Sequence, residues 1–313
     1  MDRALVTGCN GFVGRALVAR LATAGYEVWG ADRVATDGAF AGKQCLIGDL
    51  CDDAFVEELF GRVEPACIVH LAGQASVRQS FDDPAQTLSD NTRPALNILN
   101  LLRRRGSRAR VLLVGSADEY GSVEPEQLPL AETTPANPES PYALAKAIQN
   151  QYGRMFAKLY DIDAVMTRSF NHTGPGQRDA FVLSNFARQV AAIRRGTRSE
   201  TIEVGNLDVK RDFLDVRDVC DAYVVLLQKG RAGETYNVCS GQSYRIGDML
   251  RQMCDIANQQ VTIRVDSTRL RPVDMPDLRG DPGKMHAHTG WSAKRPIEET
   301  LRSLLDYWDK EDA

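Results

Sequence analysis

A tyrosine and a lysine four residues apart form the clearest catalytic candidate in the chain. Tyr142 and Lys146 follow Pro141, a residue that favours the first turn of a helix, and their spacing puts both side chains on one helical face. A free tyrosine has a pKa of about 10 and exchanges protons poorly at neutral pH. A neighbouring ammonium favours the phenolate and lowers that pKa. The pair therefore predicts proton transfer by Tyr142, supported by Lys146.

A serine is the third member of this candidate site. Ser116 comes just after residues 111–114, an apolar run that predicts a buried strand. At the end of that strand, its hydroxyl could bind a reacting carbonyl beside Tyr142. A tyrosine–lysine pair at this spacing also arises by chance, but here it falls on the helix that follows a serine-ended strand. We therefore predict that Ser116, Tyr142 and Lys146 act together.

A glycine-rich turn near the N-terminus predicts a dinucleotide site. Gly8, Gly11 and Gly14 recur at intervals of three between the first predicted strand and the first predicted helix. This spacing allows a sharp turn, close approach of backbone amides to a pyrophosphate, and tight packing of the helix on the sheet. Asp32 ends the second predicted strand, where its carboxylate can accept hydrogen bonds from the adenosine ribose hydroxyls.

The residue after this aspartate affects the choice of cofactor. Asp32 should repel a 2′-phosphate, whereas the guanidinium of Arg33 could partly accommodate one. We therefore expect NADH to be preferred and NADPH to be tolerated. The predicted cofactor contacts are Gly8, Asn10, Gly11, Phe12, Val13, Gly14, Asp32, Arg33, Asp49, Leu50, Leu71, Ala72, Gly73, Tyr142, Lys146 and Phe170.

The elements that must position these residues alternate along the first half of the chain. Near-continuous apolar runs predict buried parallel strands, and the amphipathic segments between them predict helices. The strands are expected at 4–6, 28–29, 45–47, 67–69 and 111–114. The helices are expected at 14–24, 53–61, 84–105, 141–160, 215–228 and 246–257.

This alternation predicts an α/β fold, with a Rossmann-type doubly wound parallel sheet. After Arg168 the rhythm loosens, which indicates a smaller C-terminal substrate-binding lobe interleaved with the sheet. We place the dinucleotide-binding domain at residues 1–170 and the lobe mainly at 171–313. Trp291 and Trp308 are expected to be packing anchors of that lobe.

The overall composition is that of an ordinary soluble protein. Hydrophobic residues make up 43% of the 313 residues, and the net charge of −4 disfavours a general nucleic-acid binder. No apolar stretch approaches the roughly 18 residues that span a bilayer, and the N-terminus enters a strand pattern directly, without a signal peptide. The seven cysteines lack the spacing of a metal site and suit a reducing cytosol. We expect a cytoplasmic protein without a metal and without nucleic-acid or membrane partners.

The three glycines, Ser116 and the Tyr142–Lys146 pair together resemble the extended short-chain dehydrogenase/reductase family, in its branch acting on nucleotide sugars. Within this branch, the chain is most similar to the reductases of GDP-4-keto-6-deoxy-D-mannose, which make GDP-D-rhamnose. The resemblance implies a nicotinamide cofactor and a GDP-sugar substrate. It spans essentially the whole chain and continues in residues 168–177, 204–206, 210–213, 270–274 and 289–291.

The residues after the catalytic serine separate the chemistries of this family. The 4,6-dehydratases carry a threonine followed by Asp-Glu or Ser-Glu, and that glutamate removes water across C5 and C6. The corresponding positions here hold Ser116, Ala117 and Asp118, and Glu119 comes one position too late. On a strand-like segment, one position would turn Glu119 to the opposite face. The resemblance therefore implies a ketone reductase. The alternatives are a GDP-mannose 4,6-dehydratase, a reductase forming GDP-6-deoxy-D-talose, and a non-catalytic dinucleotide sensor.

The resemblance also implies the contacts with the substrate. Arg211 and Arg271 match positions that contact the nucleotide diphosphate. Asn171 matches a residue that binds the diphosphate or the sugar, and Asp274 matches one that binds the ribose. Asp118 completes the predicted substrate site.

Two further predictions concern the surroundings of His172 and the contact between two copies of the chain. His172 could pack within its loop or contact the sugar, and Arg178 and Asn185 could line the same pocket. The helices predicted at 84–105 and 141–160 carry more apolar residues than one sheet face needs. In relatives these two helices form the dimer interface, so a homodimer is expected.

Overall fold

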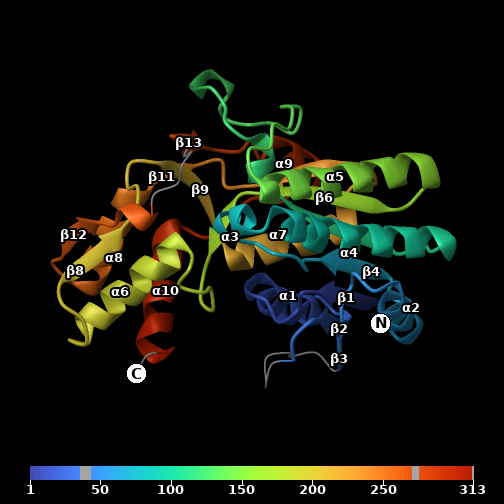
Figure 1. Cartoon of the computed structure of the whole chain (residues 1–313), viewed down its shortest axis with the longest axis horizontal. Coiled ribbons are helices and arrows are strands. Elements are labelled where there is room, and N and C mark those ends of the chain that lie inside the picture. Colours follow the sequence, from blue (N-terminus) through green and yellow to red (C-terminus); the bar gives the residue numbers. More distant parts are fainter. Residues whose placement is uncertain (36–43, 270–274, 312–313) are drawn as a thin grey trace.

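The computed structural model describes residues 1–35, 44–269 and 275–311, and it divides into a large parallel sheet with its helices and a smaller lobe (Figure 1). The large sheet has seven strands in the order β10-β6-β5-β4-β1-β2-β3, and every neighbouring pair is parallel. Its strands are β1 (Arg3–Thr7), β2 (Glu27–Asp32), β3 (Gln44–Ile47), β4 (Cys67–His70), β5 (Arg110–Ser116), β6 (Ala164–Ser169) and β10 (Thr235–Val238).

Helices cover both faces of this sheet because successive strand side chains point to opposite faces. Val6 belongs to the core that the sheet shares with α1 (Phe12–Thr23), α7 (Val216–Lys229) and α9 (Gly283–Thr289). Leu5 belongs to the core on the other face, shared with α2 (Asp53–Val63), α4 (Pro84–Arg104) and α5 (Pro141–Tyr160). The short helix α3 (Val77–Asp82) packs against α4 and α5. The predicted doubly wound α/β fold is confirmed.

The smaller lobe is built around β9 (Lys210–Asp215), which pairs with β7 (Asn171–Thr173), β11 (Ser243–Arg245) and β13 (Asp277–Leu278). A second pair joins β8 (Thr201–Val204) to β12 (Thr262–Val265). The helices α6 (Val182–Arg194), α8 (Ile246–Ala257) and α10 (Ile297–Glu311) enclose the core of the lobe. Short 3₁₀ turns complete the fold at η1 (Ala117–Tyr120), η2 (Pro125–Gln127) and η3 (Ser267–Arg269).

The two parts are interleaved along the chain. β10 and α9 come from the second half of the sequence but belong to the large sheet and its core. The division at residue 170 stays a prediction. Trp308 packs in the lobe, where its indole N–H donates to the Ser184 hydroxyl at 3.0 Å. Trp291 was placed wrongly, because it is buried in the core under the large sheet. Within the described ranges, no helix is both long and apolar enough to cross a membrane.

Candidate active site

The three predicted catalytic residues meet where β5 ends and α5 begins. Ser116 is the last residue of β5. Pro141 is the first residue of α5, and Ser140 caps this helix because its hydroxyl accepts the N–H of Ala143 at 3.1 Å. α5 packs along β5 and β6, so its first two turns lie beside the carboxyl ends of these strands. Tyr142 and Lys146 occupy those turns. The fold therefore brings all three side chains to one end of the sheet.

The tyrosine is held in its protonated form. Burial raises the pKa of Tyr142 above its usual value, and the negative charge of Asp118 acts in the same direction. A hydrogen bond with Ser116 lowers this pKa, but the first two effects outweigh it. The expectation that the pKa of Tyr142 would be lowered is therefore wrong for this structure. A protonated phenol can donate a proton at neutral pH, which is the role that a carbonyl reduction requires.

Lys146 is buried against the backbone of β5. Its ammonium donates to the Val114 carbonyl at 2.9 Å and to Gln149 Oε1 at 3.4 Å. Burial lowers the pKa of Lys146 to about 8, while the nearby charge of Glu119 acts in the opposite direction. The ammonium is therefore mostly charged at neutral pH.

The hydroxyl of Ser116 is engaged by the residue two positions later. It donates to Asp118 Oδ2 at 3.1 Å and accepts the N–H of Asp118 at 3.2 Å. These bonds form because the chain enters the 3₁₀ turn η1 directly after Ser116. The expectation of a strand-like segment here is therefore wrong. Glu119 is nevertheless directed away from the surface, because the turn points its side chain inward, where it is fully buried.

The glycine-rich turn has the close backbone contacts that a dinucleotide site needs. Gly8 adopts a φ of +70°, and a Cβ there would lie 2.9 Å from the backbone nitrogen of Ala72. A Cβ on Gly14 would lie 2.2 Å from the carbonyl oxygen of Gly8. Gly11, at the N-cap of α1, has no side chain to bond the first amides of the helix. Those amides remain available to phosphate oxygens, so this turn fits a dinucleotide.

The acidic residue at the end of β2 braces the same turn. Asp32 Oδ2 accepts the backbone N–H of Asn10 at 3.0 Å, and the side chain of Asn10 donates to the Val34 carbonyl at 2.7 Å. Asp32 remains half-exposed, so its carboxylate is available to a ribose. Arg33 is exposed, and its guanidinium pairs with Asp90 at 3.2 Å.

The remaining predicted cofactor residues lie at the ends of neighbouring strands. The Asp49 carboxylate accepts the N–H of Cys51 at 2.8 Å, and Leu50 is buried after β3. Residues 71–73 follow β4 and contact the glycine-rich turn, since Ala72 N–H donates to the Thr7 hydroxyl at 3.3 Å. Val13, in the first turn of α1, packs against the core. These positions surround the carboxyl ends of the strands, where open α/β sheets bind their ligands.

One predicted cofactor residue is used differently. Phe170 is 1% exposed, and its ring packs against Tyr120 with centroids 6.3 Å apart. A ring with almost no free surface serves packing, so the prediction that it contacts the cofactor is not supported for its side chain. Phe12 stacks on His172 of β7 with centroids 6.3 Å apart, which joins the cofactor turn to the strand that begins after Phe170.

Two side chains near Gly73 were missed by sequence reasoning. Among the described residues, Asn91 Oδ1 and Gln74 Oε1 are buried without a hydrogen-bond partner. Asn91 Oδ1 lies 2.4 Å from the place of a Cβ on Gly73. Buried oxygens without partners at this edge fit a ligand with donor groups. Asn91 lies within a helix, where its spacing gave no sign of this role.

The predicted substrate residues are partly brought together. Asn171 on β7 and Arg211 on β9 lie on paired strands. The guanidinium of Arg211 is buried and donates to the carbonyls of Lys210 and Met275, each at 2.7 Å. Arg211 therefore holds the chain near residue 275 in this structure. Arg271 and Asp274 lie outside the described residues.

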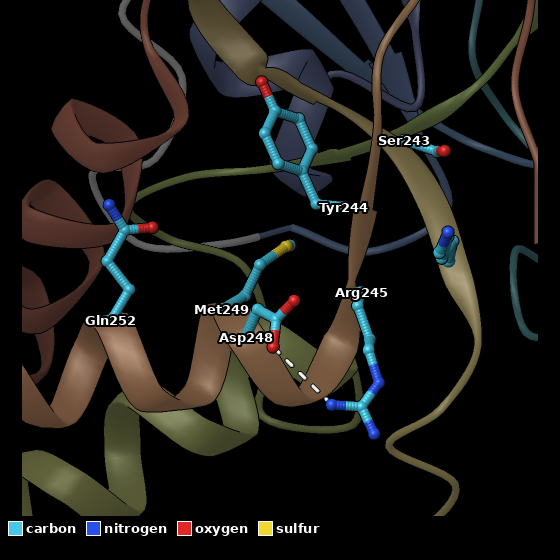
Figure 2. A pocket seen from close by; sticks show the side chains of 7 residues that line it. Ser243, Tyr244, Arg245, Asp248, Met249 and Gln252 are labelled. Carbon is cyan, nitrogen blue, oxygen red and sulfur yellow. Dashed lines mark ion pairs between the residues drawn. The ribbon is translucent and has the colours of Figure 1, made fainter.

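A surface pocket of about 500 Å³ lies elsewhere in the lobe. Figure 2 shows Tyr244 and Arg245 leaving β11 in opposite directions, and Arg245 paired with Asp248 of α8 at 3.5 Å. The residues that line this pocket are Lys210, Ser243, Tyr244, Arg245, Asp248, Met249 and Gln252. None of these is a predicted site residue, so the pocket is separate from the catalytic centre.

Comparisons with known proteins agree with this geometry. Residues 5–304 match the family described as GDP-mannose 4,6 dehydratase. GDP-6-deoxy-D-mannose reductase of Pseudomonas aeruginosa is 37% identical over 98% of this chain and 97% of that protein. GDP-mannose 4,6 dehydratase 1 of Arabidopsis thaliana is 27% identical over 97% of this chain and 88% of that protein.

Solved structures show the same fold over the whole chain. RMD from Pseudomonas aeruginosa, complexed with NADPH, superposes with a TM-score of 0.89 at 36% identity, covering 99% of this chain and 100% of that one. UDP-glucose 4-epimerase from Thermotoga maritima gives 0.90 at 25% identity, with coverage of 99% and 100%. The chain therefore belongs to the GDP-mannose 4,6-dehydratase family, within the nucleotide-sugar branch of the extended short-chain dehydrogenase/reductases.

Proposed function

We propose that this protein reduces the C4 ketone of GDP-4-keto-6-deoxy-D-mannose to GDP-D-rhamnose. The observation that carries the proposal is the arrangement around Ser116. Asp118 is bonded back to the serine hydroxyl, and Glu119 is fully buried. The elimination would need a longer glutamate at the position of Asp118, whereas here that position carries the shorter aspartate, which is bonded to Ser116, and the glutamate beside it is buried. Ser116, Tyr142 and Lys146 remain, and these three suffice for a ketone reduction.

Each of these groups has its own role in the reduction. The dinucleotide, held by the glycine-rich turn and Asp32, supplies the hydride. Tyr142 binds the carbonyl oxygen and donates its proton to the alkoxide that develops on it. Ser116 binds the same oxygen when its hydroxyl turns from Asp118 to the substrate. A raised pKa suits Tyr142 to this role because it keeps the phenol protonated until the oxyanion forms. Lys146 supplies a nearby positive charge.

The comparisons support this activity over the alternatives. A relative 37% identical over nearly the whole chain is named GDP-6-deoxy-D-mannose reductase. The dehydratase relatives are less similar, at 27% identity in the Arabidopsis thaliana protein. A non-catalytic sensor would need none of the three catalytic side chains, yet all three lie together here.

The finer choice of cofactor is also part of the proposal. We expect NADH to be preferred because the half-exposed Asp32 carboxylate at the end of β2 would repel a 2′-phosphate, while Asp90 engages the guanidinium of Arg33. The related Pseudomonas aeruginosa structure holds NADPH, so tolerance of NADPH is expected. A comparison of kcat/KM with the two dinucleotides tests this preference.

We further propose a cytoplasmic homodimer that assembles through α4 and α5. These two helices pack on each other, and α5 leaves Leu144, Met155 and Leu159 exposed. A largely apolar surface hollow between the N-termini of the two helices adds to this face. An exposed apolar face of this kind suits a second copy of the chain. The seven free cysteines suit a reducing compartment.

The deciding experiment supplies the purified protein with GDP-4-keto-6-deoxy-D-mannose and NADH, and follows NADH oxidation. NMR of the product then gives the configuration at C4. The proposal predicts GDP-D-rhamnose, whereas GDP-6-deoxy-D-talose would show hydride delivery to the other face. In a parallel reaction with GDP-mannose alone, formation of a ketosugar would instead establish a dehydratase. Tight NADH binding without turnover of any ketosugar would favour the sensor.

A further inference from the structure

Glu119 is a buried carboxylate that neither the predicted site nor the proposed mechanism uses. It lies in η1 beside Ser116 and is 0% exposed. A buried charge is costly unless it is paired and hydrogen-bonded, so its partners indicate what it does. Those partners come from three elements next to the catalytic residues: β5, α5 and β6.

The first oxygen of Glu119 holds the catalytic serine. Oε1 accepts the backbone N–H of Ser116 at 3.1 Å, which closes a capping box around η1. Gly115 is the residue before Ser116, and a Cβ on Gly115 would lie 2.4 Å from the same Glu119 oxygen. The carboxylate therefore fits tightly against the end of β5 and fixes where Ser116 leaves the sheet.

The second oxygen ties this strand end to the catalytic helix. Oε2 accepts from Asn150 Nδ2 of α5 at 3.3 Å and from Arg168 Nε of β6 at 3.2 Å. Asn150 is one turn beyond Lys146, and it also accepts from the Thr235 hydroxyl of β10 at 2.9 Å. One carboxylate thus connects β5, α5 and β6 directly, and β10 through Asn150.

We propose that Glu119 is a positioning residue that sets the placement of Ser116 relative to Tyr142 and Lys146 on α5. The proposal rests on the proposed reductase activity and adds a residue to it. Ser116 and α5 come from separate segments, so backbone connectivity alone does not fix their separation. Glu119 does so with one hydrogen bond to the strand end and one to the helix, while Arg168 compensates its charge.

The charge of Glu119 also acts on the catalytic groups. It raises the pKa of Lys146 and of Tyr142, although burial has the larger effect on each. Burial raises the pKa of Glu119 itself to about 7, opposed by Arg168, by the Ser116 N–H and by Lys146. Each oxygen of Glu119 faces a donor, so a proton on either one displaces a hydrogen bond. Wild-type kcat is therefore expected to fall as the pH drops through about 7.

Glu119→Gln tests the proposal, because it keeps the length of the side chain and removes its charge. The NH₂ group of the glutamine is a donor. It would face either the Ser116 N–H or the N–H groups of Asn150 and Arg168, which are donors themselves. We expect kcat to fall about 10- to 100-fold, as for a displacement of the reacting groups on the order of 1 Å, while the Kd for NADH changes little. The acid limb of the kcat profile should disappear, and the alkaline limb of Lys146 should move to lower pH.

Asp218→Asn is the matched control. Asp218 is also buried and paired with an arginine, Arg295, but it lies on α7 and holds the backbone before α10. This variant should lose stability while keeping the wild-type kcat and both limbs of the pH profile. A merely structural role for Glu119 predicts the same behaviour for the two variants.

A milder variant serves if Glu119→Gln does not fold. Asn150→Ala removes the bond from Glu119 to α5, together with the bond from the Thr235 hydroxyl, and leaves the Glu119–Arg168 pair. We expect a several-fold loss of kcat with the KM for the ketosugar unchanged. The positioning role is overturned if the variant that folds, Glu119→Gln or Asn150→Ala, has the same kcat as the wild type. It is also overturned if the acid limb persists in Glu119→Gln. An inactive wild-type protein would instead reject the proposed reductase, so the two failures are distinguishable.

Discussion

Replacement of Tyr142 by phenylalanine removes the proposed proton donor and little else. The phenol is half-buried at the start of α5, and its hydroxyl forms a hydrogen bond with Ser116. Phenylalanine keeps the ring and its packing. The cofactor turn lies on other elements, so the Kd for NADH should stay close to that of the wild type.

The size of the effect follows from the state of this phenol. Because its pKa is raised, fewer than about one Tyr142 in a thousand is ionised at pH 7, so nearly every active site holds the proton. Ser116 cannot take over, since its hydroxyl is a far weaker acid and is engaged by Asp118. Loss of a general acid lowers kcat by about 10²- to 10⁴-fold. Loss of one buried hydrogen bond costs about 1 kcal/mol of stability.

The assay is NADH oxidation by Tyr142→Phe with saturating ketosugar, combined with thermal unfolding and NADH titration. Tyr152→Phe is the matched control, because Tyr152 lies on the same helix and packs into the core behind the sheet. It should keep wild-type kcat. A Tyr142→Phe variant with kcat within tenfold of the wild type refutes the assignment of Tyr142 as the acid, whatever its stability.

Three further changes have defined outcomes. Gly14→Ala should weaken NADH binding at least tenfold in a fluorescence titration, because its Cβ would meet the Gly8 carbonyl oxygen at 2.2 Å and displace the turn; unchanged affinity would contradict this. Wild-type kcat should fall as the pH rises above about 8, since Lys146 then loses its charge, and a profile flat to pH 10 would exclude that role. The double variant Met155→Glu/Leu159→Glu should be monomeric by light scattering if α5 forms the interface, whereas a persistent dimer would place the interface elsewhere.

Local patterns predicted most of the elements in the first half of the chain. The predicted strands lie within β1 to β5, and the predicted helices correspond to α1, α2, α4 and α5 within a few residues. Strands buried on both faces are continuous apolar runs, so they are visible in sequence. α6 and α10 in the smaller lobe were missed, because the rhythm of strands and helices is weaker there. α7 and α8 were predicted at nearly their observed bounds.

The sequence by itself determined the two parts of the site that depend on local geometry. Gly8, Gly11 and Gly14 specify a turn, and the spacing of Tyr142 and Lys146 specifies one helical face, because backbone geometry relates residues a few positions apart. Only the tertiary structure decided how these groups are charged and held. Burial raises the pKa of Tyr142 where local reasoning predicted a decrease.

The tertiary structure also assigned partners that no spacing could indicate. Glu119 reaches Asn150 and Arg168, which lie 31 and 49 residues further along the chain. Arg211 turns to the Met275 carbonyl, 64 residues away. Desolvation and hydrogen bonding depend on which distant segments pack together, and that packing is a property of the whole fold.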